Sequence, residues 1–334
     1  MSIFGRSRRE DSSTEDDEEE VLEEEPRAKR IKDLAPQNKK KRKEPIKPWG
    51  KTERIIVLTF LLLTVFIPAA LAASARNWKL PGLPRISLPK FSGEETIIIE
   101  GDNSSKKKSE EATKYFEDKT RNLSGVYALY VVRLGSGSSY GLNQTEVMQA
   151  ASLIKLPVMA AVYRQAEKGS INLDSKVAGA NSTYRQLLGA MGHSSDNAAQ
   201  VKVVAAIGKD EVQKTIEEIG MEDTSLEENL TTAKDIGVFF QRLWNGLILT
   251  DKNRDEMLDF LTDTIYESWI AGGISQVRVA HKYGREVHVV NDAGIIYSEP
   301  PFVLVIVSRG VIETEADEAI PEIAAKVFAI ETSN

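Results

Sequence analysis

The alternation of charged and apolar stretches divides the 334-residue chain into four parts. Residues 1–54 hold an acidic block followed by a basic block, and segments of like charge that bury no apolar surface are typically disordered. Residues 55–75 carry no charge. Residues 76–108 contain three prolines and a run of lysines, which predict an extended linker with a short strand at 96–100. Only residues 109–334 show the periodicities of a folded domain.

The uncharged segment 55–75 is long enough to cross a bilayer, because a helix of its length spans about 30 Å. Trp49 and Trp78 flank it, as aromatic side chains do at membrane interfaces. Excess Lys and Arg before the segment predicts a single-pass anchor in the cytoplasmic membrane, with the N-terminus inside and the folded domain outside. A cleaved signal peptide is the alternative, because 70–72 and 73–75 resemble cleavage sites. The long charged region before the apolar core favours the anchor.

Within the folded part, strand patterns occur at both ends and helical patterns lie between them. Strands are expected at 126–134, near Tyr140, and at 277–282, 287–290, 294–297 and 302–307. Helices are expected at 110–122, 158–165, 183–191, 196–206, 209–219, 232–244, 254–261 and 315–330. This order predicts an α+β fold, in which an antiparallel sheet built from distant segments is flanked by helices and carries an inserted all-helical lobe. A site is expected in the cleft between lobe and sheet.

The amino-acid composition excludes some kinds of binding site. The chain has no cysteine, which excludes disulfides and thiolate metal sites, and its three histidines lack metal-ligand spacing, so we expect neither metal nor cofactor. The net charge of −7 gives no basic excess for nucleic acid, and the one basic cluster, at 39–43, directly precedes the membrane segment. We expect a monomer.

The most informative short motif joins Ser152 and Lys155. Ser152 opens an apolar helix that ends at Gly169, and Lys155 lies three residues on, on the same helical face. A hydroxyl beside an amine that can take its proton is the minimum for an activated serine. Ser-x-x-Lys occurs four times in the chain, and only this copy opens an apolar helix. An ordinary helix cap followed by a solvated lysine is the alternative for this motif alone.

Two further elements follow in order. Ser195-Asp196-Asn197 begins a helix, and Lys282-Tyr283-Gly284 ends a strand. Taken singly, the first is also a plain helix cap and the second a strand end with a turn glycine. A specified tripeptide is expected by chance in about one chain in ten of this size or fewer, so three elements in one order favour a functional reading.

These elements resemble the Ser-x-x-Lys, Ser-Asp-Asn and Lys-Thr-Gly signature of class A β-lactamases and penicillin-binding proteins. The phrases ASLIKLPV, HSSDNAA and VAHKYG…VVNDAGIIY around them, and NLTTAKDIGVFFQRLWNG, are also similar to that family. The resemblance covers roughly residues 109–334. It implies one β-lactamase/transpeptidase-like catalytic domain that acts on a β-lactam or a peptidoglycan stem peptide through an acyl-serine intermediate.

The resemblance also implies roles. Ser152 would be the nucleophile, Lys155 its proton acceptor, and Ser195 the shuttle that protonates the leaving nitrogen. Asn197 would contact the substrate amide and Asp196 would brace the lobe.

On the strand side, Lys282 would favour an anionic substrate and, with the helix N-terminus, lower the pKa of Lys155. The backbone N–H groups of Ser152 and Arg285 would form the oxyanion hole, next to Gly284.

Two departures from the family pattern matter. Tyr283 stands where the family has a Thr or Ser that contacts the substrate carboxylate, and Arg278 or Arg285 is the candidate replacement. The stretch after Asn197 is shorter than in class A β-lactamases and lacks their Glu-x-x-Leu-Asn sequence, so no deacylating glutamate aligns. Its acidic residues are expected to be surface charge: Glu222, Glu227 and Glu228. Slow deacylation, as in penicillin-binding or DD-peptidase-like proteins, is therefore an alternative, and a non-catalytic cell-wall sensor or scaffold is another.

Overall fold

The computed structural model describes residues 103–333 and, before them, only residues 50–51, 55, 57–59, 61–62 and 64. Most of the expected membrane segment, nearly all of the charged tail and the expected strand at 96–100 lie outside the described residues. Among the residues that are described, no helix combines the length and the apolar character needed to cross a membrane.

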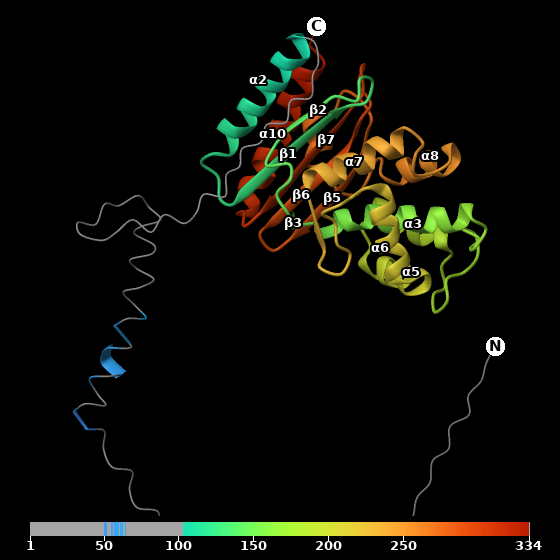
Figure 1. The fold of residues 1–334 in the computed structure, drawn as a ribbon, viewed down its shortest axis with the longest axis horizontal. Coiled ribbons are helices and arrows are strands. Elements are labelled where there is room, and N and C mark those ends of the chain that lie inside the picture. The colour runs from blue at the N-terminus through green and yellow to red at the C-terminus, as the bar shows by residue number, and fades with distance from the viewer. Residues whose placement is uncertain are drawn as a thin grey trace, which may run out of the picture. The chain divides into compact units, whose positions relative to one another are not determined.

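A five-stranded antiparallel sheet forms the centre of the domain, in the order β2-β1-β7-β6-β5 (Figure 1). The strands are β1 (Val126–Arg133), β2 (Ser139–Leu142), β5 (Val279–Glu286), β6 (Val289–Ile296) and β7 (Phe302–Arg309). The expectation that strands from both ends of the chain share one sheet is confirmed, because β1 pairs with β7 along its whole length.

The two strands expected at 287–290 and 294–297 are wrong, since β6 is a single strand. The polar residues Asn291 and Asp292, which interrupt the apolar pattern, are buried inside it with hydrogen-bond partners. The β5–β6 turn falls at Val287 and His288, and His288 has a φ of +60°.

Two terminal helices, α2 (Asn103–Thr120) and α10 (Glu313–Glu331), cover one face of the sheet (Figure 1). Helix α2 begins six residues before the expected start of the domain at 109, so residues 103–108 are helical and not part of a linker. Arg133 on β1 helps to hold both helices, α2 and α10, against the sheet. It forms an ion pair with the buried Glu331 of α10 at 2.7 Å and donates to Ser109 Oγ of α2 at 3.1 Å.

The opposite face carries the expected helical lobe (Figure 1). The lobe helices begin and end close to the expected residues; α6, for example, runs from Lys209 to Ile219 as expected. The elements of the lobe are the 3₁₀ turn η1 (Ala151–Ile154), α3 (Lys155–Glu167), α4 (Tyr184–His193), α5 (Asn197–Ile207), α6, α7 (Ala233–Trp244) and α8 (Asp251–Phe260), with a two-stranded ribbon of β3 (Met148–Gln149) and β4 (Leu230–Thr231). The short helix α9 (Ile270–Gly273) instead lies on the other face, where it packs against α10.

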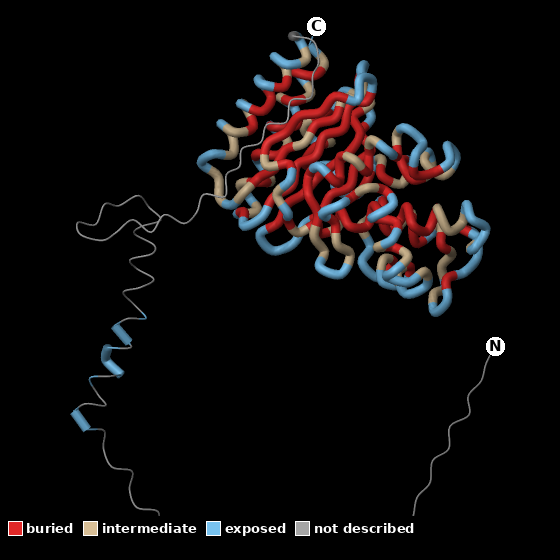
Figure 2. The backbone as a smooth tube through the Cα atoms, viewed as in Figure 1, coloured by how far each residue is buried: buried red, intermediate tan, exposed pale blue. Residues whose placement is uncertain are grey.

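Apolar side chains fill both faces of the sheet, which is buried throughout its centre (Figure 2). Successive residues of a strand point to opposite faces, so Ala128 and Val132 of β1 pack towards the lobe, whereas Leu129 and Val131 pack towards α2 and α10. Two apolar cores thus fix the sheet between its helices. The edge strand β5 is left beside η1, and the candidate site lies at that junction.

Candidate active site

Ser152 and Lys155 lie side by side at the start of the buried helix α3. Ser152 is in the 3₁₀ turn and Lys155 is the first residue of the helix proper. Lys155 Nζ lies 2.6 Å from Ser152 Oγ and 2.6 Å from Asn197 Oδ1, and the lysine is only 1% exposed. The structure therefore brings the first two sequence motifs together through one amine.

The Lys155 amine has unusual acid–base properties. Burial lowers its pKa to about 8, against the opposing effect of the nearby carboxylates of Asp196 and Glu286. The sequence led us to expect that the charge of Lys282 lowers the pKa of Lys155, but burial is the main cause of the shift. A lysine with this pKa is neutral in an appreciable fraction of molecules near neutral pH, and a neutral amine can accept a proton from a neighbouring hydroxyl.

The Ser-Asp-Asn element is both a helix cap and part of the site. Asp196 is the N-cap of α5 and accepts hydrogen bonds from the backbone N–H groups of Ala198 and Ala199 at 2.7 and 3.0 Å. The neighbouring Ser195 has a φ of +56°, and its buried Oγ has no hydrogen-bond partner among the described residues. Ala151, directly before Ser152, also has a positive φ, of +49°. Left-handed backbone at non-glycine residues is costly and often occurs at functional sites.

Gly284 on the edge strand faces the Ser152 backbone. A Cβ at this position would lie 2.9 Å from Ser152 N, closer than real Cβ atoms come, and 3.2 Å from Ala150 O, which is unusually tight. Glycine is therefore what lets β5 approach the amide of Ser152, next to Arg285, where the oxyanion hole is expected.

Lys282, one residue earlier, is completely buried. Its Nζ donates to the carbonyl oxygen of Tyr283 at 3.0 Å and lies 3.8 Å from the centroid of the Tyr283 ring. Burial, followed by the charge of Lys155, lowers its pKa to about 7, although Asp292 opposes the shift. Lys282 is not among the residues that line the cavity.

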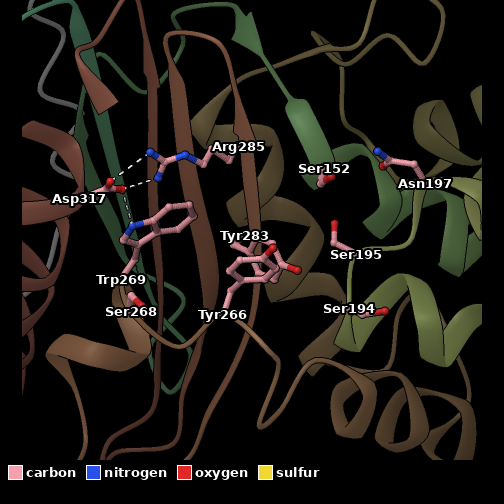
Figure 3. Close-up of a pocket in the computed structure, with 10 residues that line it drawn as sticks. All are labelled: Ser152, Ser194, Ser195, Asn197, Tyr266, Ser268, Trp269, Tyr283, Arg285 and Asp317. Carbon is pink, nitrogen blue, oxygen red and sulfur yellow. Dashed lines mark hydrogen bonds and ion pairs between the residues drawn. The ribbon is translucent and has the colours of Figure 1, made fainter. Parts of the chain in front are cut away.

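A cavity of about 570 Å³ opens between the lobe and the edge strand (Figure 3). Ser152, Ser195 and Asn197 lie on its lobe side, and the rings of Tyr266 and Tyr283 lie between them and a second group of side chains. The lining residues are Ser152, Ser194, Ser195, Asn197, Tyr266, Ser268, Trp269, Tyr283, Arg285 and Asp317.

Several of these residues were not identified from the sequence. Tyr266 and Trp269 come from the segment between α8 and β5, and their rings lie 4.3 and 6.2 Å from that of Tyr283. In the sequence, only the presence of two aromatic residues in a stretch without helical or strand periodicity points to this part of the site. Asp317, by contrast, is one of several acidic residues on α10, and no local feature distinguishes it.

The two arginines expected to contact an anion differ in position. Arg278 lies outside the main cavity, where it pairs with Asp259 at 2.7 Å. Arg285 lines the cavity, but both of its terminal nitrogens bind the carboxylate of Asp317, at 2.6 and 3.1 Å (Figure 3). Asp317 also accepts a hydrogen bond from the Trp269 indole at 3.0 Å.

A buried histidine joins the aromatic segment to the sheet. His281 Nδ1 lies 2.8 Å from Asp292 Oδ1, and its Nε2 lies 3.2 Å from Glu267 Oε1. Burial lowers the pKa of His281, but the two carboxylates outweigh it and raise the pKa to about 9. Asp292 also accepts from the backbone N–H of Ile270 at 2.9 Å, so the network holds this segment against the site.

The three glutamates of the shortened stretch are exposed, and none lines the cavity. Glu227 pairs with Lys209 on the surface, in agreement with the surface-charge expectation for this residue.

Comparisons with known proteins agree with this geometry. The family model described as the β-lactamase enzyme family matches residues 110–330. No curated protein sequence matches the chain at a significant level. Among solved structures, a β-lactamase from Sphaerobacter thermophilus is similar, with 23% identity, a TM-score of 0.60, and coverage of 67% of this chain and 96% of that one.

Two other solved structures share the fold. The structure of PBP-A is 22% identical, with a TM-score of 0.60 over 68% of this chain and 97% of that one. The class A β-lactamase of the last common ancestor of Gram-negative bacteria is 21% identical, with a TM-score of 0.62 over 65% and 98%. Because the family model spans well over half of its length, this chain belongs to the β-lactamase enzyme family of serine hydrolases.

Proposed function

We propose that the chain hydrolyses or transfers acyl groups through a covalent ester on Ser152. The observation that carries the proposal is the contact of Lys155 Nζ with Ser152 Oγ at 2.6 Å, made by a buried amine whose pKa is lowered to about 8. A neutral Lys155 accepts the hydroxyl proton while donating to Asn197, and Ser152 Oγ attacks the acyl carbonyl.

The remaining steps use neighbouring groups. The backbone N–H groups of Ser152 and Arg285 stabilise the oxyanion, and the close approach of Gly284 to Ser152 N supports this assignment. When the acyl–nitrogen bond breaks, Ser195 passes the proton from Lys155 to the leaving nitrogen. Its unpartnered hydroxyl supports that role. Asn197 holds the amine and reaches the substrate amide.

We propose a β-lactam or a peptidoglycan stem peptide as the substrate class, with slow release of the acyl group. The solved structures that share the fold include a β-lactamase and PBP-A. Slow release is supported by the exposed positions of Glu222, Glu227 and Glu228, because none of the described residues that line the cavity is a glutamate that could activate water.

The test is covalent labelling of the full chain in detergent with a fluorescent penicillin, with Ser152→Ala as the control. Labelling that needs Ser152 and persists for hours supports a penicillin-binding, peptidase-like activity. Labelling that needs Ser152 but decays within seconds supports an efficient lactamase. The ring of Tyr283 over Lys282 favours a non-catalytic binding domain as the second candidate, which absence of labelling in folded protein would select.

For location, we propose a single-pass membrane anchor at residues 55–75, with the catalytic domain outside the cytoplasmic membrane. The uncharged length of that segment and the basic residues before it support the proposal. Retention in the membrane pellet after an alkaline carbonate wash, lost on deletion of residues 55–75, tests it. Release by the wash would refute it.

A further inference from the structure

Among the described residues, three cationic side chains lie in or beside the cavity, and each already has a partner. Lys155 contacts Ser152 and Asn197. Lys282 is 0% exposed, and the Tyr283 ring covers its ammonium at 3.8 Å from the ring centroid. A lysine beneath an aromatic ring can donate to a backbone carbonyl, as here, but cannot reach a ligand on the far side of the ring.

Arg285 is the only one of the three with substantial exposure, and its charge is compensated. Its guanidinium makes two parallel hydrogen bonds to Asp317, and this bidentate geometry uses the fork that would otherwise bind a substrate carboxylate. Trp269 donates to the same carboxylate, which fixes the orientation of Asp317. A second anion placed here would have to displace Asp317 and would meet its repulsion.

Apart from the paired Arg285 and Asp317, the residues that line the cavity are uncharged. The rings of Tyr266, Trp269 and Tyr283 form an aromatic wall (Figure 3). The buried hydroxyls of Ser195 and Tyr283 make no hydrogen bond of ordinary geometry among the described residues. They lie close to each other, since burial raises the pKa of Tyr283 and an interaction with the Ser195 hydroxyl opposes that shift. Such hydroxyls are satisfied by a neutral carbonyl or amide, whereas an apolar wall favours apolar substituents.

We propose that Tyr283, by covering Lys282, and Asp317, by holding Arg285, make the cleft selective for neutral acyl substrates with aromatic or other apolar groups over substrates that carry a carboxylate beside the scissile bond. This inference rests on acylation of Ser152 as proposed above, and it narrows the proposed substrate class. β-Lactams and stem peptides carry such a carboxylate, so we expect them to acylate Ser152 more slowly than neutral derivatives of the same acyl group. With a neutral ester, the Ser152 Oγ–acyl bond forms and the ester C–O bond breaks. The Ser152 proton leaves with the alcohol, and water then cleaves the acyl-serine to a carboxylic acid.

A matched pair of probes tests the selectivity: a fluorescent penicillin with its free carboxylate, and its methyl ester. The full chain in detergent is mixed with each probe, and the second-order rate constant of Ser152-dependent labelling is measured, with Ser152→Ala subtracted. The wild-type protein should react faster with the methyl ester. In Tyr283→Thr the ratio should move towards the carboxylate by about tenfold, the effect of one charge-assisted hydrogen bond.

Two further variants separate the causes. Tyr283→Phe keeps the ring over Lys282 and should keep the wild-type preference. Asp317→Asn still accepts from Trp269 but releases the charge of Arg285, and it should shift the ratio in the same direction as Tyr283→Thr. It also serves as the test if Tyr283→Thr does not fold.

Each outcome is decisive. A wild-type preference for the free carboxylate would overturn the inference while leaving the proposed function intact. If the ratio of the two labelling rate constants is unchanged in Asp317→Asn and in folded Tyr283→Thr, the inference is likewise overturned and the proposed function stands. Labelling of Ser152 by neither probe would refute the proposed function, and the inference with it.

Discussion

The pH dependence of acylation follows from the environment of Lys155. Only the neutral amine can accept the Ser152 proton, and burial lowers its pKa to about 8. The neutral fraction is therefore about 1% at pH 6, about 10% at pH 7 and half at pH 8. The acylation rate constant should rise about tenfold per pH unit up to pH 7 and become constant above about pH 9. A lysine with its ordinary pKa, about 10.4, would keep the rate rising beyond pH 10.

The assay is the single-turnover rate of acylation of the full chain by a neutral ester, whose own charge does not change between pH 5.5 and 10. Asn197→Asp is the matched perturbation, because it replaces the amide oxygen 2.6 Å from Lys155 Nζ by a carboxylate of the same shape. An anion at that distance stabilises the ammonium and raises the pKa of Lys155. The midpoint should move up by at least about one pH unit, and the rate at pH 7 should fall by about tenfold.

Two results would refute the reasoning. A rate independent of pH between 6 and 9 would mean that Lys155 is not the base. A midpoint that stays in place in Asn197→Asp would mean that the titrating group is not in contact with residue 197. Lys155→Arg gives the limiting case, because a guanidinium is never neutral in this range, and it should lose most of the acylation rate at every pH.

Three further predictions concern neighbouring residues. Gly284→Ala should lower the acylation rate by about 100-fold or more, because its Cβ would push the edge strand away from the Ser152 amide; a wild-type rate would contradict the oxyanion assignment. Asp196→Ala should lower the free energy of unfolding in urea by about 1 kcal/mol through loss of the α5 cap, and no change would contradict that role. The folded pKa of His281, about 9, exceeds its unfolded value, so its stabilising effect is complete below about pH 6.5 and is lost as the pH rises through 9. The difference in unfolding free energy between wild type and His281→Gln should therefore shrink by about 3 kcal/mol between pH 6 and pH 10, and a constant difference would contradict the network.

The helical lobe could be predicted from the sequence because its signals are local. Apolar residues recur at helical spacing, and caps such as Thr183 and Asp196 mark where helices begin. The Ser152–Lys155 motif is local as well, since its two residues lie within one turn. These elements can be predicted because the residues that interact in them are close together in the sequence.

The features that could not be predicted depend on contacts between distant segments. Helix α2 begins in a polar stretch that has no apolar periodicity, and its first turns are held by contacts with Arg133 and the C-terminal segment. Strand β6 continues through Asn291 and Asp292 because both find buried partners 11 or more residues away. The Arg285–Asp317 side of the cavity also depends on contacts between distant segments, because Asp317 reaches Arg285 only when α10 packs against the sheet.

The distribution of unfavourable features argues that the site exists for chemistry. Lys155 and Lys282 are both buried, and each carries a lowered pKa, which means that folding disfavours its charge. Ala151 and Ser195 adopt left-handed backbone, and the Ser195 hydroxyl is buried without a partner among the described residues. Each feature lowers stability, and all of them lie in or beside the cavity that Ser152 lines. A domain that only bound a ligand would be more stable with a neutral side chain at position 155 and a partnered one at 195. The arrangement makes sense when a proton has to leave Ser152, because only a destabilised amine accepts that proton near neutral pH.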